Sequence, residues 1–349
     1  MLGGLTVVTA AMAATTTPRS ESLASALPGK PRLGLGMASL GRPGYINLGH
    51  KDDLPAERTK EAMRLHAHAV LDEAYALGLR YIDCARSYGL SEQFVASWLA
   101  ERPEVAEAVV VGSKWGYEYT ADWRVEVAEG EAHEVKKHTV EQHVRQLGET
   151  RELLGSKLAL YQIHSATEES GVLEADDVLE VLAKLRDDGV AIGASVSFPQ
   201  ARPLELAASA SKSGAPVFSS VQATFNLLDQ SAAPQLRAAH EAGVLVIIKE
   251  ALANGRLTSR TTDAAVRQLL VEEADKLDTT PDALALAWVL SHEWVGMVLS
   301  GASSVEMLRS NADALRIAPL PADVMARLGE ALGQEVESYW ADRRALAWN

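Results

Sequence analysis

The stretch YIDCARSYG, residues 81–89, begins as an apolar run and ends in polar side chains. Asp83 closes the apolar run, and Tyr88 follows it in the next loop. The end of a buried strand is rigid and the loop after it is open to small molecules, so α/β enzymes place reactive groups there. The stretch therefore predicts a strand whose carboxyl end carries part of a reaction site.

Seven other β-rich runs accompany this stretch, and nearly every gap between runs carries a helical pattern. Val178, Leu182 and Leu185 have the spacing of one apolar helix face. Glycines follow several of these helices, as expected where a helix ends and the chain turns. Eight strands alternating with helices predict a parallel (β/α)8 TIM barrel, with an open doubly wound sheet as the alternative. The runs cover residues 32–38, 80–85, 108–115, 158–164, 191–198, 218–225, 244–251 and 295–302.

Composition narrows the class of protein. The chain has 349 residues, 47% hydrophobic and 23% charged, which is enough for one large domain. It has no apolar run of about eighteen residues, so we expect no membrane-spanning helix. A net charge of -14 without a basic stripe argues against nucleic acid as a partner. Cys84 is the only cysteine, which excludes an internal disulfide and fits a reducing, cytoplasmic compartment.

Residues 1–30 differ from the rest of the chain, being rich in Ala, Thr and Ser and lacking the basic start of a secretory signal. We interpret them as a disordered tail, with an organelle-targeting signal as the alternative. Residues 31–349 are expected to form a single β/α barrel domain. This domain would carry an insertion near residues 117–136, after the third strand, and a C-terminal helical tail.

Four polar side chains lie at or just after the ends of the second, third and fourth predicted strands, and barrel geometry would bring them to one face. Lys114, flanked by VVVGS and WG, would be poorly hydrated and would need a carboxylate such as Asp83. A cation beside Tyr88 would lower its pKa from about 10 and make the phenol a general acid or base. His164 could polarise a carbonyl oxygen. With no nucleophile or metal cluster evident, the missing reagent is most simply a hydride from a nicotinamide cofactor.

Aromatic residues gather after the third strand. Trp115, Tyr119 and Trp123 lie close together, and the segment that follows alternates like a hairpin turning at Gly130. One interpretation is a surface hairpin packed on the barrel rim, and the other is a lid that covers an apolar substrate. With Met37, these three aromatic residues are the expected substrate contacts.

The remaining chemically active residues receive structural interpretations. Strand alternation places Cys84 opposite Asp83, so we expect a core residue rather than a nucleophile. His133, His138 and His143 show no ligand spacing that would justify a metal site, and we expect them on a solvated face.

Six segments together resemble the aldo-keto reductases in their order and approximate spacing, closest in style to the branch related to potassium-channel β subunits. The resemblance implies a β/α barrel that binds NADP(H), or alternatively NAD(H), and interconverts aldehydes or ketones with alcohols. It also implies catalytic roles for Asp83, Tyr88, Lys114 and His164. A redox-sensing regulatory protein with little turnover is the alternative. The segments are YIDCARSYGLSE (81–92), VGSKWG (111–116), LALYQIHS (158–165), VQATFNLLD (221–229), EALANGRLT (250–258) and VLSGASSVEMLRSN (298–311).

The resemblance further implies a set of cofactor contacts, in which the ring of Phe225 stacks on the nicotinamide. The chain departs from the family pattern after its seventh strand, where an aromatic-Ser-Pro stretch is replaced by Lys249, Glu250 and Ala251. The implied contacts are Ser195, Gln222, Phe225, Leu252, Gly301, Ser303 and Asn311.

The implied partners are small molecules. We expect a carbonyl or alcohol substrate and a monomer or small homo-oligomer. For a cofactor 2′-phosphate, the nearest candidate cations are Arg256, Arg260 and Arg309.

Overall fold

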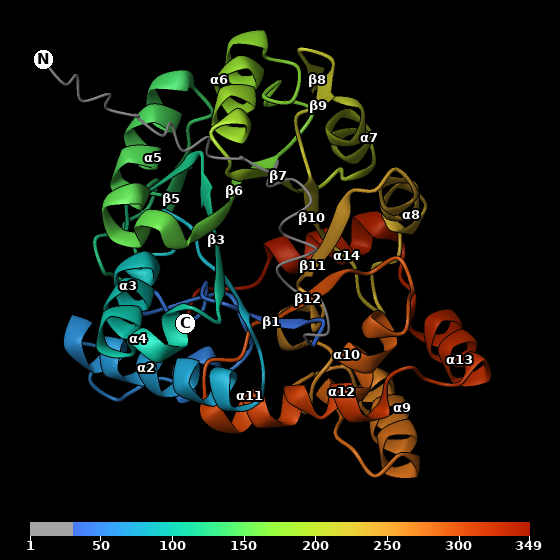
Figure 1. Cartoon of the computed structure of the whole chain (residues 1–349). Coiled ribbons are helices and arrows are strands. Elements are labelled where there is room, and N and C mark those ends of the chain that lie inside the picture. The colour runs from blue at the N-terminus through green and yellow to red at the C-terminus, as the bar shows by residue number, and fades with distance from the viewer. Residues whose placement is uncertain (1–30) are drawn as a thin grey trace, which may run out of the picture.

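A computed structural model describes residues 31–349, and the expected tail or targeting segment, residues 1–30, lies outside the described residues. Eight parallel strands close into a barrel in the order β1-β12-β11-β10-β7-β6-β3-β2. Helices surround these strands (Figure 1). The predicted (β/α)8 barrel is confirmed.

Closure distinguishes this barrel from an open sheet. The first strand pairs with the last one, Leu33 beside Val298, and also with the second, Leu35 beside Ile82. Because every barrel strand has two neighbours, the doubly wound alternative is excluded. The barrel strands are β1 Leu33–Gly36, β2 Tyr81–Asp83, β3 Val110–Trp115, β6 Leu158–Ala166, β7 Ala191–Val196, β10 Ser220–Thr224, β11 Leu245–Lys249 and β12 Met297–Ser300.

Three of the long helices begin with a threonine cap. Thr59, Thr139 and Thr280 each accept a backbone N–H with their side chains, which satisfies a donor that the first helical turn leaves free. The helices are α2 Lys60–Ala76, α3 Ser91–Glu101, α4 Pro103–Ala106, α5 Val140–Leu154, α6 Asp176–Asp187, α7 Ala201–Ser209, α8 Ala233–Glu241, α9 Ala264–Lys276, α10 Pro281–Leu290, α11 Val305–Ala312, α12 Ala314–Ile317, α13 Ala322–Leu332 and α14 Val336–Arg344.

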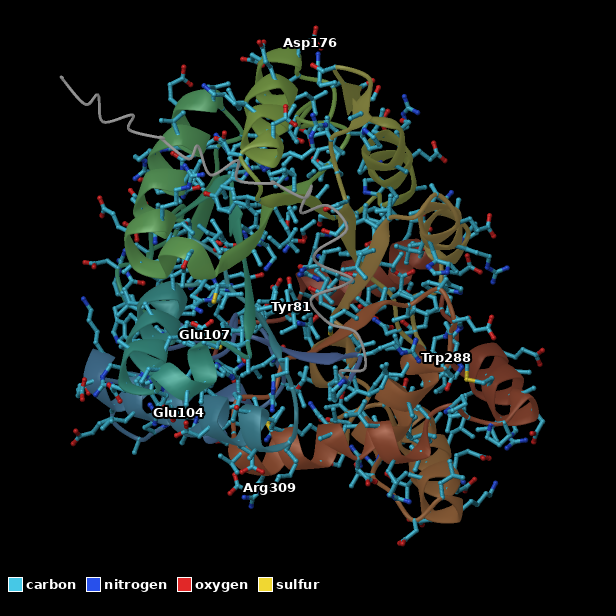
Figure 2. The ribbon with its side chains drawn as sticks, viewed as in Figure 1. Tyr81, Glu104, Glu107, Asp176, Trp288 and Arg309 are labelled. Carbon is cyan, nitrogen blue, oxygen red and sulfur yellow. The ribbon has the colours of Figure 1, made fainter. Side chains whose placement is uncertain are left out.

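Strand alternation divides the buried side chains into two sets. The set inside the barrel comprises Tyr81, Val110, Leu160, Ala191, Ile247, Met297 and Leu299. The side chain of Tyr81 lies at the centre of the barrel, whereas Glu104, Glu107 and Asp176 lie on the outside (Figure 2). Glycine is required at Gly112, because a Cβ there would overlap the Tyr81 hydroxyl. The interior below the strand ends is thus a packed core rather than a channel.

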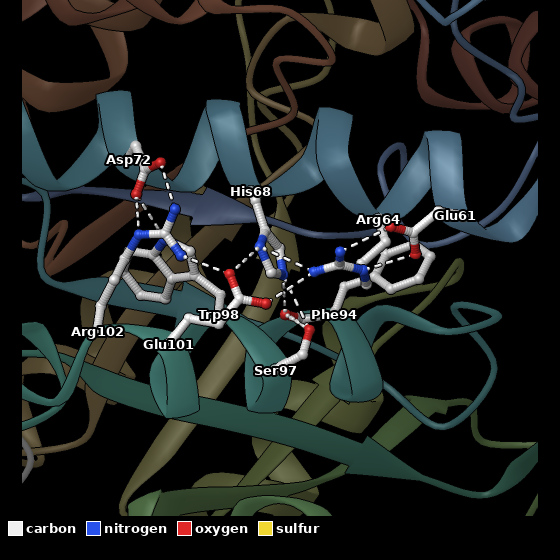
Figure 3. A network of polar contacts seen from close by, with 9 residues as sticks. All are labelled: Glu61, Arg64, His68, Asp72, Phe94, Ser97, Trp98, Glu101 and Arg102. Carbon is white, nitrogen blue, oxygen red and sulfur yellow. Dashed lines mark hydrogen bonds and ion pairs between the residues drawn. The ribbon is translucent and has the colours of Figure 1, made fainter.

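A polar network joins α2 to α3 on the outer layer (Figure 3). His68 is buried between the two helices, where its Nε2 lies 2.9 Å from Ser97 Oγ. Glu101 accepts a hydrogen bond from Arg64 (2.9 Å), and Asp72 accepts one from the indole of Trp98 (2.8 Å). These contacts fix the layer that carries the loop after β2.

Two additions lie at the carboxyl end of the barrel. Strands β4 (Tyr117–Tyr119) and β5 (Glu134–Lys136) form an antiparallel hairpin after β3. The C-terminal helix α14 is held by an ion pair between Arg343 and Glu250, at the end of β11. Beyond it, Asn349 Nδ2 donates to the carbonyl of Asn47 (2.9 Å), so the end of the chain reaches the loop after β1. Among residues 31–349, no helix is long and apolar enough to cross a membrane.

Candidate active site

The four polar residues predicted from the strand ends come together in the structure. Lys114, on β3, has no exposed surface and forms an ion pair with Asp83 on β2. Its Nζ also donates to the Cys84 carbonyl (3.0 Å) and lies 4.7 Å from the centre of the Tyr88 ring. The Tyr88 hydroxyl is 3.4 Å from Nε2 of His164, which projects from β6. Asp83, Tyr88 and His164 line a cavity of about 500 Å³ at the carboxyl end of the barrel, and Lys114 lies behind the Tyr88 ring.

Asp83 is the centre of the polar floor beneath this cavity. Its Oδ2 accepts hydrogen bonds from the Tyr81 hydroxyl (3.1 Å), Gln162 Nε2 (3.3 Å) and Gln222 Nε2 (2.9 Å). A buried ion pair is tolerated when further hydrogen bonds satisfy its remaining atoms, and here three neutral donors supply them. The lysine is therefore fixed in position beneath the phenol.

The protonation states differ in one respect from the sequence prediction. Burial raises the pKa of Tyr88 well above its ordinary value, with the charge of Asp83 adding to the effect. The prediction that this pKa is lowered was wrong for the free protein, because burial outweighs the cations near the phenol. Burial, followed by the charge of Lys114, holds the pKa of His164 well below its ordinary value. At neutral pH, Tyr88 is therefore a protonated phenol and His164 a neutral imidazole.

Tight backbone packing fixes the loop that carries Tyr88. Gly89 has a φ of +58°, and a Cβ there would overlap the carbonyl oxygen of Gly41 in the loop after β1. The Leu90 N–H donates to that same carbonyl (2.7 Å). Ser87 Oγ, in the same loop, is 3.2 Å from Nδ1 of His164. The loops after β1 and β2 therefore hold phenol and imidazole in one arrangement.

The structure brings only some of the expected cofactor contacts to the cavity. Gln222, Leu252 and Gly301 line it. Ser195 is buried, and its Oγ has no hydrogen-bond partner among the described residues. Ser303 donates to Asp53 (3.1 Å), and Asn311 lies 2.8 Å from Ser300 Oγ, so both are engaged within the protein.

Phe225 does not reach the cavity. Its ring stacks on Trp288 of α10, with 5.3 Å between ring centroids, and meets the edge of Trp294. Because Gln222 faces the barrel interior, a residue three positions later on the same extended segment faces out. The ring therefore packs between barrel and helices and is not placed to stack on a nicotinamide.

Lys249 is a pocket residue that sequence reasoning noted only as a departure from a pattern. It lies two residues after the interior side chain of Ile247 and lines the cavity. Burial lowers its pKa to about 8. In the part of the chain that the structure describes, no ion pair joins Lys249 to a carboxylate, whereas Arg260 and Arg343 each have one. The sequence signal that could have identified Lys249 is its spacing: residues two apart on a strand share a face, so Lys249 faces the barrel interior with Ile247.

Comparisons with known proteins agree with this geometry. A family model described as "Aldo/keto reductase family" matches residues 32–332. The chain belongs to the aldo/keto reductase family. It is an oxidoreductase by that membership, and it is similar to the uncharacterized oxidoreductase YqkF of Bacillus subtilis, with 25% identity over 77% of this chain and 89% of the relative. The protein Tas of Escherichia coli is 24% identical over the same shares.

Solved structures share the fold of this aldo/keto reductase. The holo form of aldo-keto reductase AKR11C1 from Bacillus halodurans has a TM-score of 0.67 and 22% identity, covering 89% of this chain and 95% of that one. PA4992 from Pseudomonas aeruginosa has a TM-score of 0.58 and 21% identity, covering 82% and 91%. At these identities the likeness extends to the barrel alone.

The arginines expected near a cofactor 2′-phosphate all face carboxylates in this aldo/keto reductase. Arg260 pairs with Asp53 through both terminal nitrogens, one of them at 2.7 Å. Arg309 pairs with Glu73 (2.8 Å) on the surface. Arg256 lies 3.7 Å from Asp342. Arg256 and Arg309 do not line the cavity, which leaves Arg260 as the one member of the set that does.

The residues expected to contact a substrate mostly point elsewhere. Met37 and Trp115 are fully buried in the core between the barrel and the helices. For Trp115 the reason is strand alternation, which places it on the face opposite Lys114. Trp123 donates to the Arg58 carbonyl (2.7 Å) and packs on Phe94, so the hairpin is held against neighbouring loops. Tyr119 is half-buried and does not line the cavity.

Other aromatic residues form a roof over the cavity, and the sequence did not indicate them. The roof consists of Tyr45, His133 and Trp348, which come from the loop after β1, the hairpin and the C-terminal tail. The rings of Trp348 and His133 stack at 3.8 Å with an interplanar angle of 3°. The ring of Tyr45 meets the edge of Trp348 at 5.8 Å.

Of the three histidines expected on a solvated face, one is buried and the other two are only partly exposed. His143 is 2% exposed, packs on Trp115 at 4.9 Å, and has its pKa lowered to about 4 by burial. His138 bonds through Nε2 to the His164 carbonyl (2.9 Å), and His133 belongs to the roof. The prediction was wrong because α5 turns His143 onto Trp115, while the hairpin and the loop before α5 bring His133 and His138 to partners within the protein.

Proposed function

We propose that this aldo/keto reductase interconverts an aldehyde or ketone with the corresponding alcohol, using NAD(P)H, with Tyr88 as the general acid and base. The observation that carries the proposal is the contact between the Tyr88 hydroxyl and His164 Nε2, 3.4 Å apart at the edge of the cavity. A protonated phenol and a neutral imidazole at this separation can both donate hydrogen bonds to one carbonyl oxygen.

The cavity suits a nicotinamide cofactor, although only part of the expected contact set faces it. Lys249 lines the cavity and offers a cation to an anionic ligand, whereas the unpartnered hydroxyl of Ser195 is buried outside the cavity lining. Gln222, Leu252 and Gly301 would complete the contacts along the strand ends. The family resemblance favours NADP(H), with Arg260 as the cation nearest to a 2′-phosphate if its pair with Asp53 opens. The reduced cofactor, when bound, supplies the hydride.

Each tetrad residue then has a distinct task. His164 orients the carbonyl oxygen toward the phenol, and Tyr88 transfers its proton to that oxygen as the carbonyl carbon gains hydride. The phenolate that remains lies beside Lys114, whose Nζ is 4.7 Å from the ring centre. Asp83 holds the lysine in place through their ion pair. In alcohol oxidation the same phenolate accepts the proton.

Steady-state turnover tests this proposal. We expect fluorescence titration to show binding of NADPH or NADH, and we expect steady cofactor oxidation with at least one member of a panel of small and bulky aldehydes and ketones. Tight cofactor binding without turnover on any carbonyl, or on any alcohol with the oxidised cofactor, would contradict an enzymatic role and favour a redox-sensing one.

The roof predicts which residues contact the substrate. We expect Trp348→Ala to raise KM for bulky carbonyls by about fivefold or more, because it removes a ring that lines the cavity and stacks on His133. Cofactor Kd should stay within about twofold. The matched comparison is Tyr119→Ala, since Tyr119 lies on the hairpin but outside the cavity lining. A larger effect on KM from Tyr119→Ala would restore the hairpin aromatics as the substrate contacts.

A further inference from the structure

Arg42 is a buried cation beside the tetrad, to which the proposed mechanism assigns no task. It lies in the loop after β1 and is only 2% exposed. Its guanidinium donates to the carbonyls of Ala38 (3.2 Å) and Ser87 (3.0 Å) and forms an ion pair with Glu134 of β5 (3.1 Å). Burying a guanidinium is costly unless its donors find partners, and the partners of Nε and Nη1 constrain its position.

Aromatic rings surround the same guanidinium. Its central carbon lies 5.2 Å from the ring centre of Tyr88, 4.8 Å from that of Tyr45 and 4.6 Å from that of Trp348. A cation over an aromatic face is attracted electrostatically, and the attraction is stronger when water is excluded. Arg42 therefore contacts the catalytic ring and the roof at once.

The backbone ensures that Arg42 and Tyr88 stay together. A Cβ at Gly41, the residue before Arg42, would overlap the carbonyl oxygen of Tyr88. The bond from Arg42 to the Ser87 carbonyl joins the same two loops one residue before the tyrosine. A displacement of Arg42 would thus be transmitted directly to the phenol.

Arg42 also differs from Lys114 in how its charge is balanced. The partner of Lys114 is Asp83, buried at the barrel floor, whereas the partner of Arg42 is Glu134, whose side chain is 27% exposed and therefore partly screened by water. We propose that Arg42 is a positioning residue that holds the Tyr88 phenol and favours its anionic form during proton transfer. This inference rests on the proposed function.

The charges that face Tyr88 agree with a role for Arg42 in favouring the phenolate. Burial raises the pKa of the phenol, as do Asp83 from β2 and Tyr45 and Glu134 from the loop after β1 and from β5, whereas Arg42 lowers it. Lys114 of β3 and the neutral His164 of β6 complete the surroundings. Glu134 and Arg42 therefore oppose each other at the same phenol.

The pH dependence of alcohol oxidation tests the inference, because this direction requires the phenolate. Arg42→Met should move the alkaline rise of kcat upward by about one pH unit, from Coulomb's law at an effective dielectric constant of about 20 with Glu134 opposing. Glu134→Gln should move the rise downward, and Arg42→Lys should largely restore it. The control is Arg124→Met, which removes an exposed hairpin arginine paired with Glu131 and should leave the profile unchanged.

A general loss of structure cannot move the pH profile of kcat in opposite directions in the two variants. If Arg42→Met does not fold, Glu134→Gln still tests the inference. A profile that stays in place in Glu134→Gln and in the folded Arg42 variants, with only the plateau lowered, would overturn the inference while leaving the proposed function intact. Absence of turnover in the wild-type protein would overturn the proposed function, and this inference with it.

Discussion

Replacing Tyr88 with phenylalanine is expected to lower kcat for carbonyl reduction by about 10²- to 10⁴-fold, the range observed for loss of a general acid or base. The substitution keeps the ring beside Lys114 and Arg42 and removes only the hydroxyl that faces His164. Since that hydroxyl is used in the transition state, cofactor Kd should change by less than about twofold.

Stopped-flow measurement of hydride transfer together with fluorescence titration of the cofactor checks this expectation. Tyr75→Phe is the matched control, because Tyr75 lies on α2 under the guanidinium of Arg80, outside the cavity lining. Retained hydride transfer in a folded Tyr88→Phe protein would show that another group, or water, supplies the proton.

The sequence was sufficient for the fold because the barrel depends on local, repeated signals. Alternating strands and helices and the glycines that follow helices predict the same architecture, and each can be recognised within a short window. The tetrad followed from the same logic, since residues at the carboxyl ends of parallel strands converge on one face. Asp83 and Lys114 illustrate this, because a poorly hydrated lysine required a carboxylate on a neighbouring strand.

The positions of Trp115 and Phe225, which were wrongly expected to contact ligands, could have been predicted from the sequence. Alternation placed Cys84 on the outer face of β2, and the same rule applied one residue after Lys114 places Trp115 outside the barrel. It also places Phe225 there. Family resemblance and aromatic content had assigned these two residues to ligands, whereas the strand period assigns them to the core.

The roof and Arg42 were beyond such reasoning. Tyr45, His133 and Trp348 meet because a loop, a hairpin and the C-terminal tail cross the same barrel mouth, and no local pattern encodes those crossings. The ion pair of Arg42 with Glu134 has the same origin. Contacts between irregular segments distant in sequence depend on the finished fold, so the sequence did not reveal the part of the cavity that we propose contacts the substrate.

Removing Lys114 is expected to separate stability from catalysis. Lys114→Met leaves the carboxylate of Asp83 buried without its cation, and breaking a buried pair in this way costs about 3–5 kcal/mol of unfolding free energy. Asp83→Asn should also destabilise the protein, because the lysine then has no countercharge. The double variant, Lys114→Met with Asp83→Asn, removes both charges and so leaves no unpaired charge buried. Its loss of stability should therefore be smaller than the sum of the two single losses.

Turnover, unlike stability, should not recover in the double variant. The double variant still lacks the ammonium 4.7 Å from the Tyr88 ring, so its hydride transfer should stay as slow as in Lys114→Met. Denaturant unfolding of the four proteins gives the coupling energy, and single-turnover rates give the catalytic comparison. Additive stability losses would contradict a buried, mutually dependent pair. Recovered turnover in the double variant would show that the lysine only compensates Asp83, because a cation needed to stabilise the phenolate cannot be replaced by the thioether of methionine.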